Sequence, residues 1–157
     1  MPNMFKLRPG RPLAENRIKN QTANIEDIQR TDQVAGCCYL AEQDALVFGS
    51  NSGIPRNLRP IVTVRARDSW IYVLPGTKLK HNDLFHIARS GCLKTVNSHG
   101  LHHDTFFSSM VELIPFHSLE WAICNLTQTV RSNLSQWLRS EFQSGRGQVR
   151  QRLTSIT

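Results

Sequence analysis

The segment 58–75, LRPIVTVRARDSWIYVLP, restricts the fold more than any other part of the sequence. Its first half is rich in β-branched residues, and Pro60 can lie only at the start or the edge of a strand. A short polar turn, Arg67-Asp68-Ser69, leads directly into a second apolar run. Two such runs joined by a short turn are typical of a β-hairpin, so we expect strands at 58–66 and 70–75.

The other apolar runs are short, and a helical pattern follows only near the end of the chain. Strands are expected at 34–40, 84–88 and 110–116, and 45–48 is a further short apolar run. After them, five apolar residues recur at helical spacing: Leu126, Val130, Leu134, Trp137 and Leu138. Thr127 is suited to cap the start of this helix, and Gly145 to end it. Several short strands and one terminal helix predict a mainly β (α+β) fold, a small half-barrel sheet with the helix packed on it.

The sequence divides into three parts by composition. Residues 1–33 are polar with charges of both signs and read as an N-terminal arm, ordered only if it docks on the domain or on a partner. Residues 34–143 carry the strand and helix patterns and form the domain. Residues 144–157 form a basic C-terminal tail. Trp137 lies on the apolar face of the helix and is expected to pack in the core. Trp70 and Tyr72 are also expected in the core, although beside Arg65 and Arg67 they could instead stack on single-stranded RNA.

The net charge and the cysteines indicate which kind of partner and which cellular compartment to expect. The formal net charge is +7 with a pI near 9.8, which favours a polyanionic partner, although a basic surface can also serve solubility alone. No apolar run approaches the roughly 20 residues of a membrane span, and the N-terminus lacks the apolar core of a secretory signal. The four cysteines include no CxxC unit, so we expect reduced, mostly buried thiols, no bound metal and a cytoplasmic protein.

Three segments, in order, resemble the PemK/MazF family of toxins. Residues 58–64 (LRPIVTV) are similar to the family's R-P-V-L-V-V strand, and 71–77 (IYVLPGT) to its strand ending in V-P-(L/I)-T. Residues 109–119 (SMVELIPFHSL), followed by 123–127 (ICNLT), are similar to its last strand, turn and final helix. The resemblance implies an SH3-like barrel, a homodimer, cleavage of single-stranded RNA without a metal or cofactor, and an antitoxin protein that covers the RNA groove.

The residues that match the family's active site are Arg59 and Thr77, which the resemblance implies are catalytic. A guanidinium pairs strongly with phosphate oxygens, and a hydroxyl can hydrogen-bond the phosphate or the attacking 2′-hydroxyl. Neither is a strong base, so proton transfer needs another group, for which His81 or His86 is placed at the loop after Thr77. The expected RNA-binding residues are Arg56, Arg65, Arg67, Lys78, Lys80 and His81.

Alternatives stay open at this point. The family's acidic opening motif is reduced here to Gly36 followed by CCYLAEQDAL, which leaves room for a module on the same fold that binds nucleic acid or protein without catalysis. A third hypothesis is that the chain has the same barrel fold but poisons DNA gyrase. His99, His102 and His103 lie close together near Asp104 and could serve acid–base chemistry or ligate a metal, but their spacing matches no metal motif and favours a solvated loop.

Overall fold

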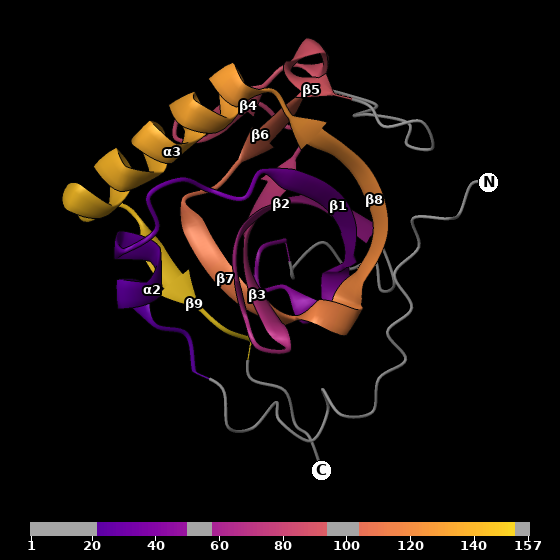
Figure 1. Cartoon of the computed structure of the whole chain (residues 1–157). Helices are drawn as coiled ribbons and strands as arrows, with labels where there is room; N and C mark the ends of the chain where they lie inside the picture. Colours follow the sequence, from indigo (N-terminus) through magenta and orange to yellow (C-terminus); the bar gives the residue numbers. More distant parts are fainter. Residues whose placement is uncertain (1–21, 50–57, 94–103, 153–157) are drawn as a thin grey trace.

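A strongly curled β-sheet forms the body of the molecule (Figure 1). The computed structural model describes residues 22–49, 58–93 and 104–152. Within these ranges the sheet has nine strands and the expected mainly β half-barrel with a C-terminal helix is confirmed. The strands are β1 (Cys37–Glu42), β2 (Leu58–Arg67), β3 (Trp70–Thr77), β4 (Phe85–Ile87), β5 (Cys92–Leu93), β6 (Thr105–Phe107), β7 (Met110–Pro115), β8 (Leu119–Leu126) and β9 (Gln148–Arg150).

The strands follow the order β4-β6-β3-β2-β1-β8-β5, and all pairs on this path are antiparallel. Strands β6 and β7 share one edge of β3, with β6 beside residues 76–77 and β7 beside residues 70–73. The expected hairpin is present as β2 and β3, which turn at Asp68 with a φ of 55°. An aspartate tolerates this left-handed conformation better than most residues, because its short polar side chain can bond to the local backbone.

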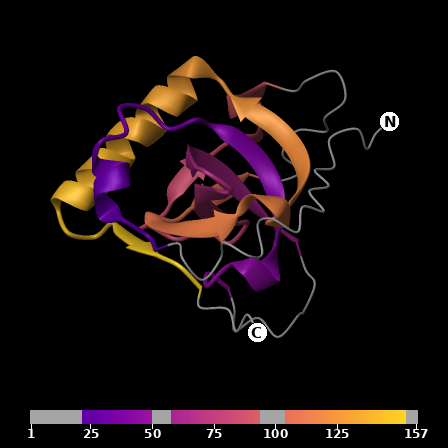
Figure 2. The same cartoon turned by 60° about the horizontal axis from the view of Figure 1, so that its bottom comes forward.

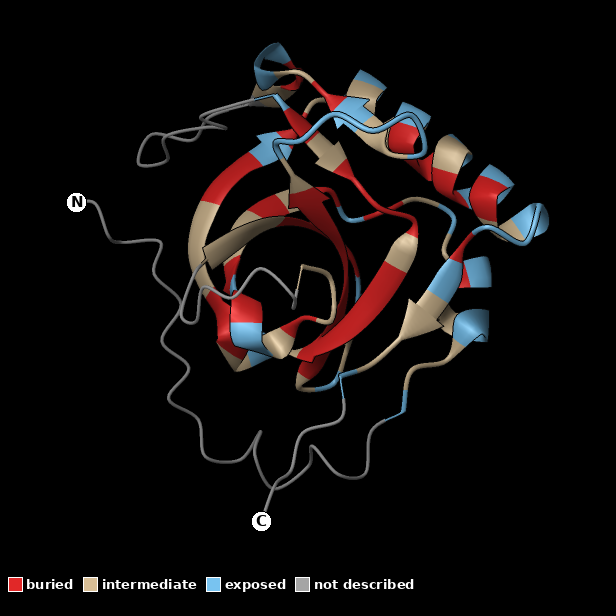
Figure 3. Ribbon diagram, turned by 180° about the vertical axis from the view of Figure 1, so that it is seen from behind, coloured by how far each residue is buried: buried red, intermediate tan, exposed pale blue. Residues whose placement is uncertain are grey.

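Two apolar clusters lie on opposite faces of the curled sheet. The inner cluster fills the barrel and consists of Ala41, Leu46, Ile61, Ile71, Val73, Ile114 and Leu119. The outer cluster lies between the sheet and helix α3 (Gln128–Gln143) and includes Trp70 and Tyr72, which are 2% and 0% exposed. Figure 3 shows continuous runs of buried residues along the central strands, and because successive residues point to opposite faces, both faces are covered. The expected core positions of these two aromatic residues are confirmed, and Trp137 packs against the same cluster with its ring 5.3 Å from that of Phe85.

Helix α3 begins after Thr127 and ends before Gly145, the two residues expected to cap and to end it. The Thr127 hydroxyl accepts a hydrogen bond from the Val130 amide at 3.3 Å, which meets one of the unpaired donors of the first turn. Gly145 follows the C-cap residue Ser144 with a φ of +86°, a conformation that glycine adopts without steric cost. The apolar pattern placed Leu126 in the helix, but this residue is the last of β8.

The described part of the N-terminal arm is docked on the domain. Helix α2 (Ile25–Gln29) lies beside α3 on the same side of the sheet (Figure 2) and places Ile28 in the outer cluster. The Tyr72 hydroxyl donates to Asp27 Oδ2 at 2.6 Å and accepts from the Asn24 amide at 3.1 Å. The arm therefore contributes to the core through one isoleucine and a set of polar contacts to β3.

Part of the expected basic tail is also built into the fold. Residues 148–150 form β9, which pairs in parallel with β7, and Arg150 Nη2 lies 3.2 Å from Glu112 Oε2. Arg146 pairs with Glu141 at 2.8 Å, and Arg152 Nη1 donates to the Leu46 carbonyl at 2.7 Å. These three arginines therefore bind groups of the protein itself. None of the helices in the described ranges has the length and apolar character needed to cross a bilayer.

Candidate functional site on the open face of β3, β4 and β6

A row of side chains crosses three neighbouring strands on one face of the sheet. In the antiparallel registers Thr77 pairs with Phe106, and Phe106 pairs with His86. Residues that face each other across antiparallel strands project on the same side. The neighbours Phe107 and Ile87 point into the outer cluster, so Thr77, Phe106 and His86 project on the opposite face, the one that is continuous with the barrel interior.

Arg59 extends this row onto β2. Arg59 lies two residues before Ile61, which pairs with Pro75, and so it projects on the same face of the sheet as Ile61. Arg59 Nη1 donates to the Gly76 carbonyl at 3.0 Å, which keeps the guanidinium at this position. We call Arg59, Thr77, Phe106 and His86 the cross-strand row. With strands about 4.8 Å apart, the row spans about 14 Å of backbone.

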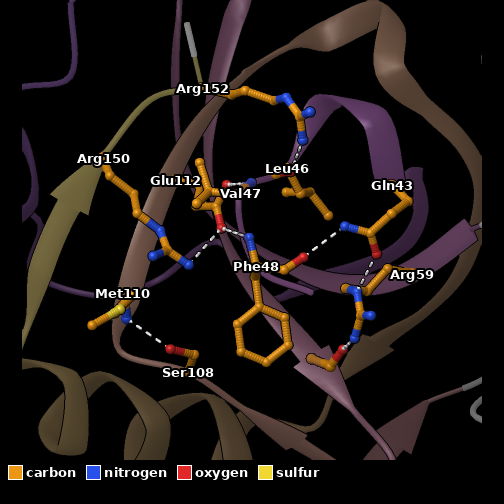
Figure 4. A network of polar contacts seen from close by, with 11 residues as sticks. Gln43, Leu46, Val47, Phe48, Arg59, Ser108, Met110, Glu112, Arg150 and Arg152 are labelled. Carbon is orange, nitrogen blue, oxygen red and sulfur yellow. Dashed lines mark hydrogen bonds and ion pairs between the residues drawn. The ribbon is translucent and has the colours of Figure 1, made fainter. Parts of the chain in front are cut away.

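The guanidinium of Arg59 is held on several sides (Figure 4). Its Nε donates to Gln43 Oε1 at 2.6 Å, and its Cζ lies 5.0 Å from the centre of the Phe48 ring. Gln43 also donates to the Phe48 carbonyl at 2.6 Å, which fixes the ring over the cation. Partial burial lowers the pKa of Arg59, and the negative charge of Glu112 opposes this shift. Because an arginine pKa starts above 12, the group stays charged at neutral pH.

A buried carboxylate fixes the segment that covers Arg59. Glu112 is 0% exposed, on the inner face of β7. Its Oε1 accepts from the Val47 amide at 2.6 Å, and its Oε2 accepts from the Phe48 amide at 2.8 Å and from Arg150 Nη2 at 3.2 Å. Figure 4 shows these three bonds converging on one side chain from two separate segments, residues 47–48 and Arg150. The position of the Phe48 ring over Arg59 therefore depends on Glu112.

At the other end of the row, an aspartate orients His86. His86 Nε2 lies 3.2 Å from Asp104 Oδ2, and Asp104 Oδ1 accepts from the Arg89 amide at 3.0 Å. The imidazole stacks on the Phe106 ring at 4.7 Å with an 18° angle between planes, and its side chain is 48% exposed. The bond from the Arg89 amide, followed by that from His86, lowers the pKa of Asp104. With Nε2–H directed at this carboxylate, Nδ1 of the neutral ring is the acceptor.

The predicted RNA-binding residues fall into separate regions. Lys78, Lys80 and His81 are exposed in the loop directly after Thr77, at the same end of the sheet as the cross-strand row. His81 Nδ1 lies 3.7 Å from Asp83 Oδ2. Arg56, with His99, His102 and His103, lies outside the described residues.

Arg65 and Arg67 lie at the far end of β2 from Arg59, and both hold the N-terminal arm. Arg65 Nη1 donates to the Asp27 carbonyl at 3.2 Å. Arg67 Nη1 donates to the Thr22 carbonyl at 2.6 Å and lies 3.5 Å from Asp27 Oδ2. Arg67 is eight steps along β2 from Arg59, which is up to about 26 Å at about 3.3 Å a step. The structure therefore does not bring these two arginines to the cross-strand row.

No family model matches the chain, and no curated protein matches it. Sequence reasoning named Arg59, Thr77 and His86 but not Phe106 or the link between His86 and Asp104. Phe106 stands in a run, DTFF, that a strand pattern could have identified, but its partners on β3 and β4 follow only from the registers.

Proposed function

We propose that this chain cleaves single-stranded RNA through the RNA's own 2′-hydroxyl, without a metal, on the face that carries the cross-strand row. The observation that supports the proposal most is the row itself. It combines a fixed cation, a hydroxyl and a histidine oriented by a carboxylate on one open face. These are the groups that phosphodiester cleavage by internal attack requires.

In this mechanism His86 Nδ1 takes the proton of the 2′-hydroxyl. The 2′ oxygen then forms a bond to phosphorus while the bond from phosphorus to the 5′ oxygen breaks. The products are a 2′,3′-cyclic phosphate and a free 5′-hydroxyl, whose proton comes from the solvent to which this face is open. Asp104 keeps the imidazole in the required tautomer, and the charge of Arg59 stabilises the negative charge that builds up on the phosphate.

The surroundings of the row suit a single-stranded polyanion. Lys78, Lys80 and His81 place positive charge or hydrogen-bond donors in the adjoining loop. Phe106 is partly exposed and offers an aromatic edge beside the histidine, where an unpaired base can be accommodated. On the family resemblance alone, we also propose a homodimer and an antitoxin partner whose acidic segment covers this face. Sedimentation of the purified chain tests the first of these.

The test is incubation of purified protein with a long single-stranded RNA in EDTA. We expect discrete cleavage that survives chelation and falls at least about 100-fold in His86→Gln, because a positioned base contributes about 10²- to 10⁴-fold. Arg59→Lys is expected to lose about 100-fold, the typical effect of removing one preorganised donor. His117→Gln is the matched control, since His117 lies in the turn 116–118, next to the β2–β3 hairpin and away from the row.

Two results would contradict the proposal. Intact RNA in the presence of well-folded protein would exclude cleavage. Equal cleavage by the wild type, His86→Gln and His117→Gln would point to a contaminating nuclease. Circular dichroism and thermal melting of each variant establish that the fold is retained.

A second function, binding of nucleic acid without cleavage, is favoured by one specific observation. Arg59 directs both Nε and Nη1 to protein acceptors, Gln43 and the Gly76 carbonyl, which is how a structural arginine is used. Under this alternative, RNA is retarded in a gel but not cut. The exposed lysines then carry the affinity, which falls steeply with salt. Lys78→Gln combined with Lys80→Gln is expected to weaken binding, whereas Arg59→Lys leaves it within about twofold.

A further inference from the structure

Three cysteines from distant parts of the sequence meet on one face of the sheet. Cys38 on β1, Cys92 on β5 and Cys124 on β8 have sulfur atoms that all lie within 4.8 Å of one another. All three are free thiols. Cys38 and Cys124 are 1% and 4% exposed, and Cys92 is partly exposed. The cluster therefore lies at the border of the outer core, with one sulfur near the surface.

The strand registers explain why the three sulfur atoms converge. Strand β8 lies between β1 and β5, and Cys38 pairs directly with Cys124. Cys92 pairs with Leu126, which is two residues after Cys124 and so projects on the same face. Cys37 projects to the other face, although it is adjacent to Cys38 in sequence, and it does not belong to the cluster.

The spacing of the sulfur atoms suits a thiophilic metal ion. In a tetrahedral zinc site with Zn–S bonds of about 2.3 Å, sulfur atoms lie about 3.8 Å apart. Sulfur atoms within 4.8 Å of one another need shifts of about an ångström to reach that geometry. Thiolates select Zn²⁺ or Cu⁺ over hard cations such as Mg²⁺ and Ca²⁺.

We propose that Cys38, Cys92 and Cys124 form a binding site for one thiophilic d¹⁰ metal ion, Zn²⁺ or Cu⁺, with three protein ligands and one position open to a small exogenous ligand. In the described ranges, no fourth histidine, cysteine or carboxylate joins the group. The ion ties β5, a two-residue strand that pairs with β8 alone among the described residues, to the wall of the barrel. The site is separate from the cross-strand row and does not depend on the proposed RNA cleavage.

The test is metal binding by the full-length, reduced, metal-free protein under anaerobic conditions. Co²⁺ serves as the spectroscopic probe, since thiolate ligation produces an intense charge-transfer absorption in the near ultraviolet, and Zn²⁺ is then titrated in to displace it. A parallel titration with Cu⁺ against a competing chelator distinguishes the two metals. We expect saturation at one metal ion per chain, and an increase of the melting temperature with Zn²⁺ or with Cu⁺.

Single alanine substitutions identify the ligands. Cys92→Ala, the least buried of the three, is expected to weaken metal binding by at least about 100-fold, because loss of a ligand costs no less than loss of an outer-shell partner, about 10- to 100-fold. Cys38→Ala and Cys124→Ala should behave in the same way. Cys37→Ala is the matched control and should bind the metal within about twofold of the wild type.

A second readout uses only the wild-type chain, so it does not depend on whether the variants fold. If the metal binds there, stoichiometric Zn²⁺ or Cu⁺ should slow alkylation of Cys92, the partly exposed cysteine of the three, by at least about tenfold. The proposal is wrong if neither metal produces saturable binding near one per chain, if Cys37→Ala loses binding as completely as Cys92→Ala, or if the metals leave the alkylation rate unchanged. A Cys38–Cys124 disulfide that persists under mild reduction would also overturn it, by removing two ligands.

Discussion

Replacing Glu112 with glutamine should destabilise the fold strongly, although the two side chains have nearly the same shape. The carboxylate accepts three hydrogen bonds, from the Val47 and Phe48 amides and from Arg150. An amide has one oxygen and one NH₂ group, so in either orientation the NH₂ group faces a buried donor. The best orientation keeps the oxygen toward Phe48 and Arg150 and leaves the Val47 amide unpaired.

The size of the effect follows from these contacts. One buried N–H without an acceptor costs about 1–3 kcal/mol. The remaining bonds also lose the negative charge that strengthened them, and Arg150 loses its ionic partner. Breaking a buried ion pair from one side typically costs about 3–5 kcal/mol in total, and we expect Glu112→Gln to lose about 3–4 kcal/mol. With a urea m-value of about 2 kcal/mol/M, the unfolding midpoint falls by about 1.5–2 M.

Urea unfolding followed by tryptophan fluorescence measures this change, with Glu141→Gln as the matched control. Glu141 is also buried and bonds to Arg146, but its other partner is the hydroxyl of Ser109. A hydroxyl can rotate to accept from the new NH₂ group, so the control should lose no more than about 1 kcal/mol. Equal losses in the two variants, or a loss below about 1 kcal/mol in Glu112→Gln, would refute the reasoning from the paired backbone amides.

Three further outcomes are expected. A Cβ on Gly76 would lie 2.6 Å from the Phe107 ring, so Gly76→Ala should cost about 1–3 kcal/mol and lower the melting temperature. Tyr72→Phe removes the donor to Asp27, a bond to a charged group worth about 1.5–3 kcal/mol, and should speed amide exchange at 22–33 more than in β2. Partial burial, then a neighbouring carboxyl, raises the pKa of Glu42 to about 7, whereas the unfolded value is about 4.3. Between these two pH values the folded chain holds a proton that the unfolded chain releases. The free energy of unfolding therefore falls as pH rises from about 4 to 7, and Glu42→Gln should flatten that part of the stability profile.

The sequence predicted the elements whose local pattern and tertiary role agree. The hairpin at 58–75 carries β-branched runs around a polar turn, and α3 carries an apolar stripe with suitable residues at both ends. Strand β8 was not recognised, because bulges in its pairing with β1 interrupt the alternation of its buried residues. Strand β9 has three residues, and only its parallel pairing with β7 makes it a strand.

The candidate sites depend even more than the strands on pairings that the sequence does not reveal. A motif resemblance pointed to Arg59 and Thr77, which lie on the two strands of the hairpin, with Arg59 bonded to the carbonyl of Gly76, the residue before Thr77. The Asp104 link to His86 depends on β4 and β6 lying side by side, and the three-cysteine cluster depends on β8 lying between β1 and β5. No spacing in the sequence encodes either arrangement. The absence of a CxxC unit argued against a metal, but that rule applies to ligands within one loop and not to ligands gathered from three strands.

The apolar run 45–48 links the stability of the fold to the proposed function. As a sequence this run of four apolar residues predicts nothing specific, and in the structure it forms no strand. Leu46 enters the barrel interior, and the amides of Val47 and Phe48 bind Glu112. This arrangement sets the Phe48 ring over the Arg59 guanidinium. A perturbation at Glu112 should therefore reach the cross-strand row through Phe48, even though Glu112 faces the barrel interior. If RNA cleavage depends on a fixed Arg59, Glu112→Gln should reduce cleavage under conditions in which the variant remains folded, and Glu141→Gln should not.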